Sequence, residues 1–181
     1  MKKILFLLLS LFTILGNAQS ISELDKKNGF KDFKLGDDFS KWSSQVAYSR
    51  TNEDGLKVYS YVGNCCNKVF DYKLNTIELG FLNSKLVLIY LETEKFQKPY
   101  SESKEFTTWR NTDFESINNS FQGLFGKPTG HNSEGDISFF WQSQKVMLRS
   151  TYKYLGVREG DMQVIFVFSL DYLKNIMNSG F

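Results

Sequence analysis

The stretch from Ile77 to Glu92, IELGFLNSKLVLIYLE, decides the fold class of this chain. It holds two apolar runs on either side of Asn83 and Ser84, and a polar pair between apolar runs is typical of a two-residue β-hairpin turn. Side chains alternate between the two faces of a strand, and here both faces receive apolar side chains. The sequence therefore predicts an antiparallel strand pair with two apolar faces.

Similar alternation extends over most of the chain. Ser143 and Gln144 are a second polar pair between apolar runs, which predicts a second hairpin in which Gln142 pairs with Lys145. The expected strands are 57–62, 69–72 continuing into 77–82, 86–92, 137–142, 145–154 and 162–170. These segments predict an antiparallel sheet of about six strands.

Three segments carry helical patterns. Residues 37–47 begin at Asp37, a candidate N-cap, and place apolar side chains at helical spacing. The segment 112–125 opens with the capping box Thr112 to Glu115 and is followed by a glycine. A short helix is expected over 171–178.

Strands and helices together predict an α+β fold with the helices on one face of the antiparallel sheet. The side chains expected on the helix-covered face are Ile77, Leu79, Phe81, Leu86, Leu88, Tyr90, Ile137, Phe139, Trp141, Val146, Leu148 and Tyr152. Residues 30–94 and 107–170 each contain a helix followed by a meander. We therefore expect a single domain made of two pseudo-repeats.

The N-terminal segment has the parts of a secretory signal peptide. Two lysines precede an apolar run from Ile4 to Leu15, and the small residues of Gly16-Asn17-Ala18 precede Gln19. The apolar run of about 12 residues is shorter than the roughly 20 that span a bilayer. We expect residues 1–18 to be removed, leaving 19–181 as a periplasmic or secreted domain with no integral membrane segment.

The charge of the expected mature chain argues against nucleic-acid binding. The full chain has 22 Lys and Arg against 20 Asp and Glu, and residues 1–18 contribute two lysines and no acidic residue. The mature chain is therefore neutral, whereas nucleic-acid binding needs clustered positive charge. The expected partner is another protein or a second copy of the chain.

The sheet face opposite the helices is more apolar than a face in contact with water usually is. By alternation it receives nine candidate binding residues, which are Leu82, Val87, Ile89, Leu91, Phe140, Met147, Arg149, Ile165 and Val167. Contiguous apolar patches often mark partner surfaces. The alternatives are that residues 19–34, residues 95–110 or a second copy of the chain cover this face.

Cys65 and Cys66 are the only cysteines and are adjacent. Disulfides persist in exported proteins, so a strained vicinal disulfide between them is one hypothesis, although a bridge prefers a Cα separation of about 5.5 Å and neighbours lie about 3.8 Å apart. The alternatives are a free or intermolecular pair, or two thiols without a special role.

His131 is the single histidine, which excludes a Cys2His2 zinc site, and no metal or cofactor is expected.

The sequence lacks the common catalytic motifs, among them Gly-x-Ser-x-Gly, the P-loop and His-Glu-x-x-His. A thiolate nucleophile would need Cys65 or Cys66 to meet His131, with Glu134 or Asp136 orienting the imidazole. Such a small hydrolase is the alternative to our leading hypothesis. That hypothesis is a non-enzymatic binding protein of inhibitor, immunity or envelope-accessory type.

Two short segments, FKLGDDF at Phe33 to Phe39 and FGKP at Phe125 to Pro128, are similar to the start and the end of the helix in a known repeat plan. The expected plan, a helix followed by an antiparallel meander and repeated once, resembles that of β-lactamase-inhibitor-like proteins and small outer-membrane assembly lipoproteins. These are small exported proteins of Gram-negative bacteria. The resemblance covers most of residues 30–170 and implies a binding module. It carries over no catalytic residue, and Cys65 and Cys66 are not part of it.

Overall fold

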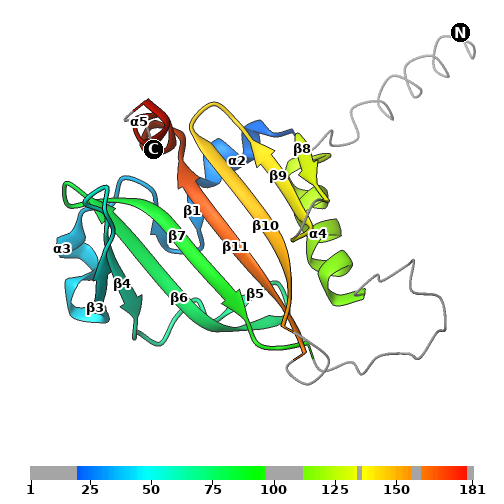
Figure 1. The fold of residues 1–181 in the computed structure, drawn as a ribbon, viewed down its shortest axis with the longest axis horizontal. Coiled ribbons are helices and arrows are strands. Elements are labelled where there is room, and N and C mark those ends of the chain that lie inside the picture. Colours follow the sequence, from blue (N-terminus) through cyan, green and yellow to red (C-terminus); the bar gives the residue numbers. More distant parts are fainter. Residues whose placement is uncertain (1–19, 97–111, 134–135, 156–159, 179–181) are drawn as a thin grey trace, which may run out of the picture.

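The structure is a computed structural model that describes residues 20–96, 112–133, 136–155 and 160–178. These residues form an α+β fold with one nine-stranded sheet, one two-stranded sheet and four α-helices (Figure 1). Within the described ranges, no helix is long and apolar enough to cross a membrane. The expected signal peptide and most of the 95–110 connection lie outside them.

The large sheet consists of two antiparallel meanders that meet at its centre. Its strands are β3 (Val46–Thr51), β4 (Lys57–Tyr61), β5 (Lys68–Val69), β6 (Tyr72–Leu82), β7 (Lys85–Thr93), β8 (Gly130–Asn132), β9 (Ser138–Gln142), β10 (Val146–Tyr154) and β11 (Asp161–Ser169). The strand order is β3-β4-β6-β7-β11-β10-β9-β8, and β5 pairs with β6 outside this path. β7, the last strand of the first meander, therefore pairs with β11, the last strand of the second.

The expectation of about six strands is wrong, because three further strands do not follow the apolar pattern. β3 is an edge strand whose residues are exposed after the first, and β5 and β8 span two and three residues. Edge and very short strands bury little apolar surface, so their sequences need no alternation.

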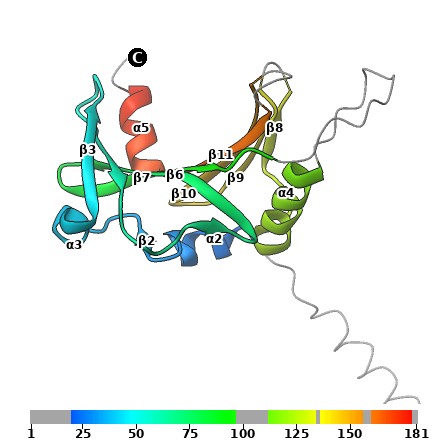
Figure 2. The same ribbon diagram turned by 90° about the horizontal axis from the view of Figure 1, so that it is seen from below.

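Helices lie on both faces of the large sheet (Figure 2). One face carries α2 (Ser22–Lys27), α4 (Thr112–Phe125) and a small hairpin formed by β1 (Gly29–Phe30) and β2 (Phe33–Lys34), and the other carries α5 (Leu170–Asn178). The helices expected over 112–125 and 171–178 are confirmed, but the expectation that all helices share one face is wrong for α5. The helix expected over 37–47 is reduced to α3 (Phe39–Trp42) and a 3-10 turn, Ser43–Gln45.

The first expected hairpin is confirmed. Leu82 pairs with Lys85, and Asn83 and Ser84 form the two-residue turn between β6 and β7. Their φ angles of 50° and 63° are those of a type I′ turn, which matches the twist of the flanking strands.

The second hairpin has a longer loop than expected, and α2 holds it. Gln142 pairs with Met147 rather than with Lys145, a shift of two residues that leaves every side chain on its expected face. Asp25 of α2 accepts a hydrogen bond from the Ser143 hydroxyl at 2.5 Å and two more from backbone N–H groups of the loop. Although burial raises the pKa of Asp25, these hydrogen bonds bring it below its ordinary value.

A β-bulge in β7 decides which of its side chains enter the core. The register of the β6–β7 pair shifts between Gly80 and Phe81, which leaves Val87 as an extra residue. Alternation therefore changes phase at this point. Ile89 and Leu91 were expected on the face opposite the helices, but both are fully buried on the face that carries α2 and α4.

The neighbouring strand β11 also turns two expected surface residues toward the core. β11 pairs with β7 so that Val167 lies opposite Ile89 and Ile165 opposite Leu91. Ile165 and Val167 therefore also lie in the core, where they are 0% and 1% exposed. The expectation that these four residues lie on the face opposite α2 and α4 is wrong. The bulge moves Ile89 and Leu91 into the core, and the pairing of Val167 with Leu148 of β10 places Val167 and Ile165 there as well.

The main core lies between the large sheet and the layer formed by α2, α4 and the β1–β2 hairpin. Its buried members are Leu24, Phe33, Leu35, Trp42, Cys66, Val69, Ile77, Leu79, Phe81, Leu86, Ile89, Leu91, Ile117, Phe121, Phe125, Trp141, Val146, Leu148, Ile165 and Val167. A smaller cluster lies on the other face beneath α5 and is centred on Leu56, Val58 and Tyr172.

Candidate functional site

A row of cross-strand neighbours crosses the face that carries α5. Direct strand pairing places Phe140 of β9, Arg149 of β10, Phe166 of β11, Tyr90 of β7 and Glu78 of β6 side by side. All five side chains are half-buried. We refer to these five residues as the cross-strand row.

Aromatic contacts make the centre of the cross-strand row rigid. The rings of Tyr90 and Phe166 meet edge to face with centroids 5.2 Å apart, and Phe166 stacks on Phe168 at 5.4 Å. The guanidinium carbon of Arg149 lies 5.5 Å from the centre of the Phe140 ring. Such contacts fix the rings and the cation in place before any partner arrives.

Arg149 has no carboxylate partner among the described residues. Its guanidinium donates hydrogen bonds to the hydroxyl groups of Thr151 at 3.2 Å and Ser138 at 3.3 Å, and both of these side chains are buried and neutral. The positive charge is therefore held in a half-buried position by neutral groups. A cation in this state retains a strong capacity to bind an anion.

Two acidic groups on the same face, two and three strands away from Arg149, are engaged with other residues. Glu78 forms a two-pronged ion pair with Arg50, at 2.8 and 2.9 Å. Glu92 accepts a hydrogen bond from the Tyr90 hydroxyl at 2.8 Å. Burial and this hydrogen bond raise the pKa of Tyr90 above its ordinary value, so the phenol keeps its proton at neutral pH.

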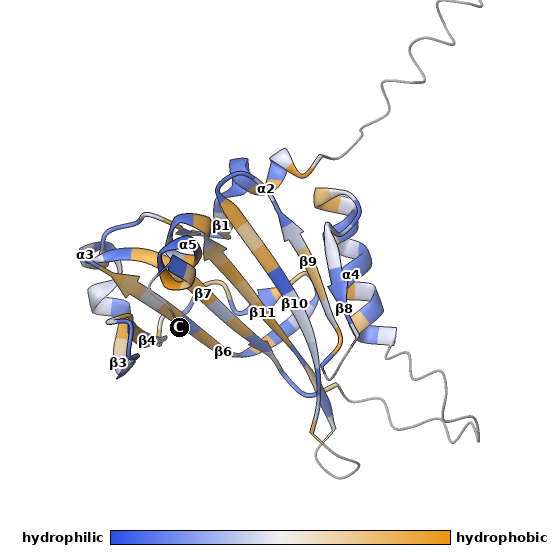
Figure 3. Cartoon of the chain, turned by 45° about the horizontal axis from the view of Figure 1, so that its top comes forward, coloured by the Kyte–Doolittle hydropathy of each residue, from blue (hydrophilic) through white to orange (hydrophobic). Residues whose placement is uncertain are grey.

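Helix α5 lies over one part of this face (Figure 3). Phe168, which stacks on Phe166 of the cross-strand row, packs against the cluster beneath the helix. Tyr172 of α5 is buried against Leu56 and Val58, and its hydroxyl donates a 2.7 Å hydrogen bond to Asp54. This contact anchors the helix to the loop between β3 and β4. The cross-strand row is therefore connected to a fixed helix through this cluster.

The structure divides the nine candidate binding residues into three groups. Phe140, Met147 and Arg149 lie half-buried on the α5 face, as expected. Leu82 and Val87 lie on the same face but pack against the cluster beneath α5. The remaining four, Ile89, Leu91, Ile165 and Val167, lie in the main core.

Sequence reasoning missed three members of the cross-strand row, Glu78, Tyr90 and Phe166. Tyr90 was assigned to the helix-covered face, and only the bulge at Val87 reverses that assignment. A usable signal was present, since Glu78, Tyr90 and Glu92 are charged or carry a polar end. Such residues fit a face that meets water better than a closed core.

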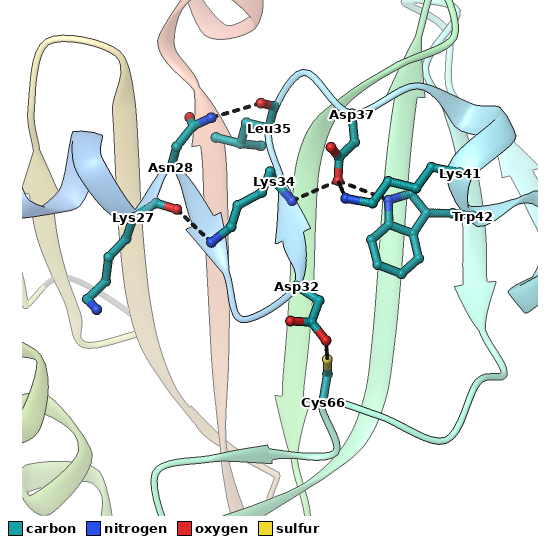
Figure 4. A network of polar contacts seen from close by, with 9 residues as sticks. All are labelled: Lys27, Asn28, Asp32, Lys34, Leu35, Asp37, Lys41, Trp42 and Cys66. Carbon is teal, nitrogen blue, oxygen red and sulfur yellow. Dashed lines mark hydrogen bonds and ion pairs between the residues drawn. The ribbon is translucent and has the colours of Figure 1, made fainter.

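The two cysteines are free thiols, so the candidate vicinal disulfide is not formed in this structure. The Cys65 sulfur lies 3.0 Å from the Tyr61 hydroxyl, and the Cys66 sulfur donates to the Asp32 carboxylate at 3.8 Å (Figure 4 draws the second contact). Burial and the adjacent Cys65 thiol raise the pKa of Cys66 to about 12. Since the thiolate is the nucleophile, the Cys66 thiol is a poor one at neutral pH.

The catalytic arrangement of the small hydrolase is not assembled. His131 lies in β8, at the edge of the sheet, while the cysteines follow β4, near the opposite edge. Five strands lie between β4 and β8 in the strand order. Asp136 is exposed, and Glu134 lies outside the described residues.

Comparison of the chain with family models, with curated proteins and with solved structures found no match.

Proposed function

We propose that this chain is an exported, non-enzymatic binding protein of inhibitor, immunity or envelope-accessory type. The cross-strand row on the α5 face is the surface that contacts its partner. The partner is a protein that presents a carboxylate flanked by apolar side chains. This proposal replaces the wider apolar face expected from sequence with a narrower surface of mixed chemistry.

The observation that carries the proposal is that Arg149 has no carboxylate partner in the described part of the chain. The residue is already half removed from water and held by Thr151, Ser138 and the Phe140 ring. A carboxylate that docks here meets a preorganised guanidinium, so little side-chain entropy remains to be lost. The rings of Phe166 and Tyr90 provide apolar surface beside it.

The charges on this face favour a carboxylate at the position opposite Arg149. Arg50 neutralises Glu78, whereas Glu92 keeps its negative charge and accepts hydrogen bonds from the neutral donors Tyr90 and Asn75. Arg149 on β10 has no carboxylate partner among the described residues, so an acidic group of the partner can pair with it. Electrostatic complementarity of this kind sets which partner binds and in which register.

The proposal predicts that Arg149→Glu abolishes partner binding without unfolding the domain. The wild-type chain, Arg149→Glu and the matched charge reversal Lys57→Glu, at an exposed position in β4, are used to capture partners from the organism that makes the chain. We expect one protein to be recovered stoichiometrically with the wild type and Lys57→Glu. Its affinity for Arg149→Glu should fall by at least about 30-fold, because losing one member of a desolvated charge pair costs about 2–5 kcal/mol.

Two further measurements separate the outcomes. Neutralising the acidic residues of the captured protein one at a time should reproduce the loss seen with Arg149→Glu. Thermal melting should show that Arg149→Glu remains folded. Equal recovery with all three chains would contradict the proposal, and so would a wild-type chain that forms a dimer broken by Arg149→Glu but captures no other protein.

Export is the second part of the proposal and predicts a defined N-terminus. The basic n-region, the short apolar run and the small residues before Gln19 support cleavage after Ala18. The chain recovered from the periplasm or medium should therefore start at Gln19. N-terminal sequencing or intact mass measures this, and a membrane-bound chain that still starts at Met1 would contradict it.

A further inference from the structure

Two turns that are distant in the sequence meet on the helix-covered side of the sheet. Asp32 lies in the turn between β1 and β2, and Cys65 and Cys66 lie in the loop between β4 and β5. Phe33, which follows Asp32 and is fully buried, packs its ring against Tyr61 at 4.9 Å. This packing fixes the turn that carries Asp32 beside the cysteine loop (Figure 4).

The backbone of the cysteine loop gathers both sulfur atoms at this place. Cys66 has a φ of 66°, in the left-handed region that non-glycine residues seldom adopt. One carboxylate oxygen of Asp32 and the two sulfur atoms all lie within 4.8 Å of one another. Among the described residues, this is the one group of histidine, cysteine or acidic side chains with such spacing.

The distances suit a tetrahedral metal ion. Zn²⁺ binds sulfur at about 2.3 Å and carboxylate oxygen at about 2.0–2.2 Å, so tetrahedral geometry places the two kinds of ligand atom about 3.5 Å apart. The observed distance between the Cys66 sulfur and Asp32 Oδ2 is 3.8 Å. A small closure of the two turns would bring these ligand atoms to bonding positions.

The ligand types select among metals. Two thiolates favour Zn²⁺ and Cu⁺ over Mg²⁺ or Ca²⁺, and a carboxylate as third ligand favours Zn²⁺ over Cu⁺. Three groups that become anionic are crowded together here, and a divalent cation offsets their mutual repulsion. The hydroxyl of Tyr61, 3.0 Å from the Cys65 sulfur, can donate to a thiolate at that position.

We propose that Asp32, Cys65 and Cys66 bind one Zn²⁺ ion through one carboxylate oxygen and two thiolate sulfurs. The two thiol protons leave to solvent when the ion binds. The fourth position of the tetrahedron is then open to water or to a ligand atom of another molecule, as in zinc sites that do not have a purely structural role. The site lies on the face opposite the cross-strand row and does not depend on the partner-binding proposal.

The test is metal titration of the reduced, exported form of the chain. Zn²⁺ is added in competition with a chromophoric chelator, and Co²⁺ is used as a spectroscopic probe. We expect one ion per chain and an absorption band from thiolate-to-Co²⁺ charge transfer. Cys65→Ser and Cys66→Ser should each weaken Zn²⁺ binding by at least roughly 100-fold, since even residues that only support a ligand contribute about 10- to 100-fold.

The remaining variants separate a ligand from a merely nearby residue. Asp32→Asn should weaken Zn²⁺ binding while the thiolate-to-Co²⁺ band is retained, and the control Asp71→Asn, at an exposed turn position, should leave both unchanged. Cys65 is only half-buried, so Cys65→Ser keeps the test valid if Cys66→Ser does not fold. Absence of stoichiometric Zn²⁺ binding, or binding that Cys65→Ser does not weaken, would overturn the proposal.

Discussion

Replacement of Ile89 by lysine is expected to abolish cooperative folding of the domain. Ile89 is fully buried, with Leu79 and Val167 as its direct neighbours on the two adjacent strands. An unpaired ammonium group at this position would cost several kcal/mol, which is comparable with the total stability of about 5–15 kcal/mol of a typical domain. Circular dichroism should show loss of the near-ultraviolet signal and of the thermal transition.

Tyr90→Lys is the matched control, since it places the same charge one residue further along β7. Tyr90 is half-buried on the α5 face, near Glu78 and Glu92. A lysine there loses ring contacts but gains acidic neighbours, so we expect a loss of about 1 kcal/mol and a melting temperature lower by roughly 2–4 °C. Equal damage from both substitutions would mean that the α5 face is also interior, and a folded Ile89→Lys would contradict the bulge.

The elements set by local chemistry could be predicted from the sequence. Asn83 and Ser84 specify a tight turn because both adopt positive φ, and nothing distant is needed to define it. The helical spacing of apolar residues from Phe114 to Leu124, followed by Gly126, predicted α4 in the same way. Local signals of this kind predicted the α+β class and the antiparallel hairpins.

The elements set by tertiary contacts could not be predicted. No residue type marks Val87 as the extra residue of a bulge, and one extra residue reverses every later face assignment along a strand. The missed bulge therefore misplaced Ile89 and Leu91. Ile165 and Val167 were misplaced because the faces of β11 depend on its register with β10 and β7, which the sequence does not show.

The same contrast holds for the two candidate sites. Phe140 and Arg149 lie on the face that the sequence predicted for them, because the second hairpin slipped by an even number of residues, which preserves faces. By contrast, Asp32 could not be connected with Cys65 and Cys66 from the sequence. Their meeting depends on the packing of Phe33 against Tyr61, which no spacing in the sequence reveals.

Trp141 joins the second half of the sheet to the end of α4. Its side chain is fully buried and lies 5.7 Å, ring to ring, from Phe121 of that helix. Its indole N–H donates a 2.9 Å hydrogen bond to the carbonyl oxygen of Gly126, which follows the helix and has a φ of 81°. Because Gly126 directly follows the last helical residue, this hydrogen bond ties the sheet to the chain at the end of α4.

Trp141→Ala is therefore expected to destabilise the domain by about 3–5 kcal/mol, through lost burial and the cavity that remains. Trp141→Phe keeps most of the apolar volume but leaves the Gly126 carbonyl without its donor, so its cost should be smaller, about 1–3 kcal/mol. Urea unfolding followed by far-ultraviolet circular dichroism measures both values on one scale. Equal costs for the two variants would show that the hydrogen bond rather than the packing dominates. A cost below about 1 kcal/mol for Trp141→Ala would mean that Trp141 does not hold α4 against the sheet.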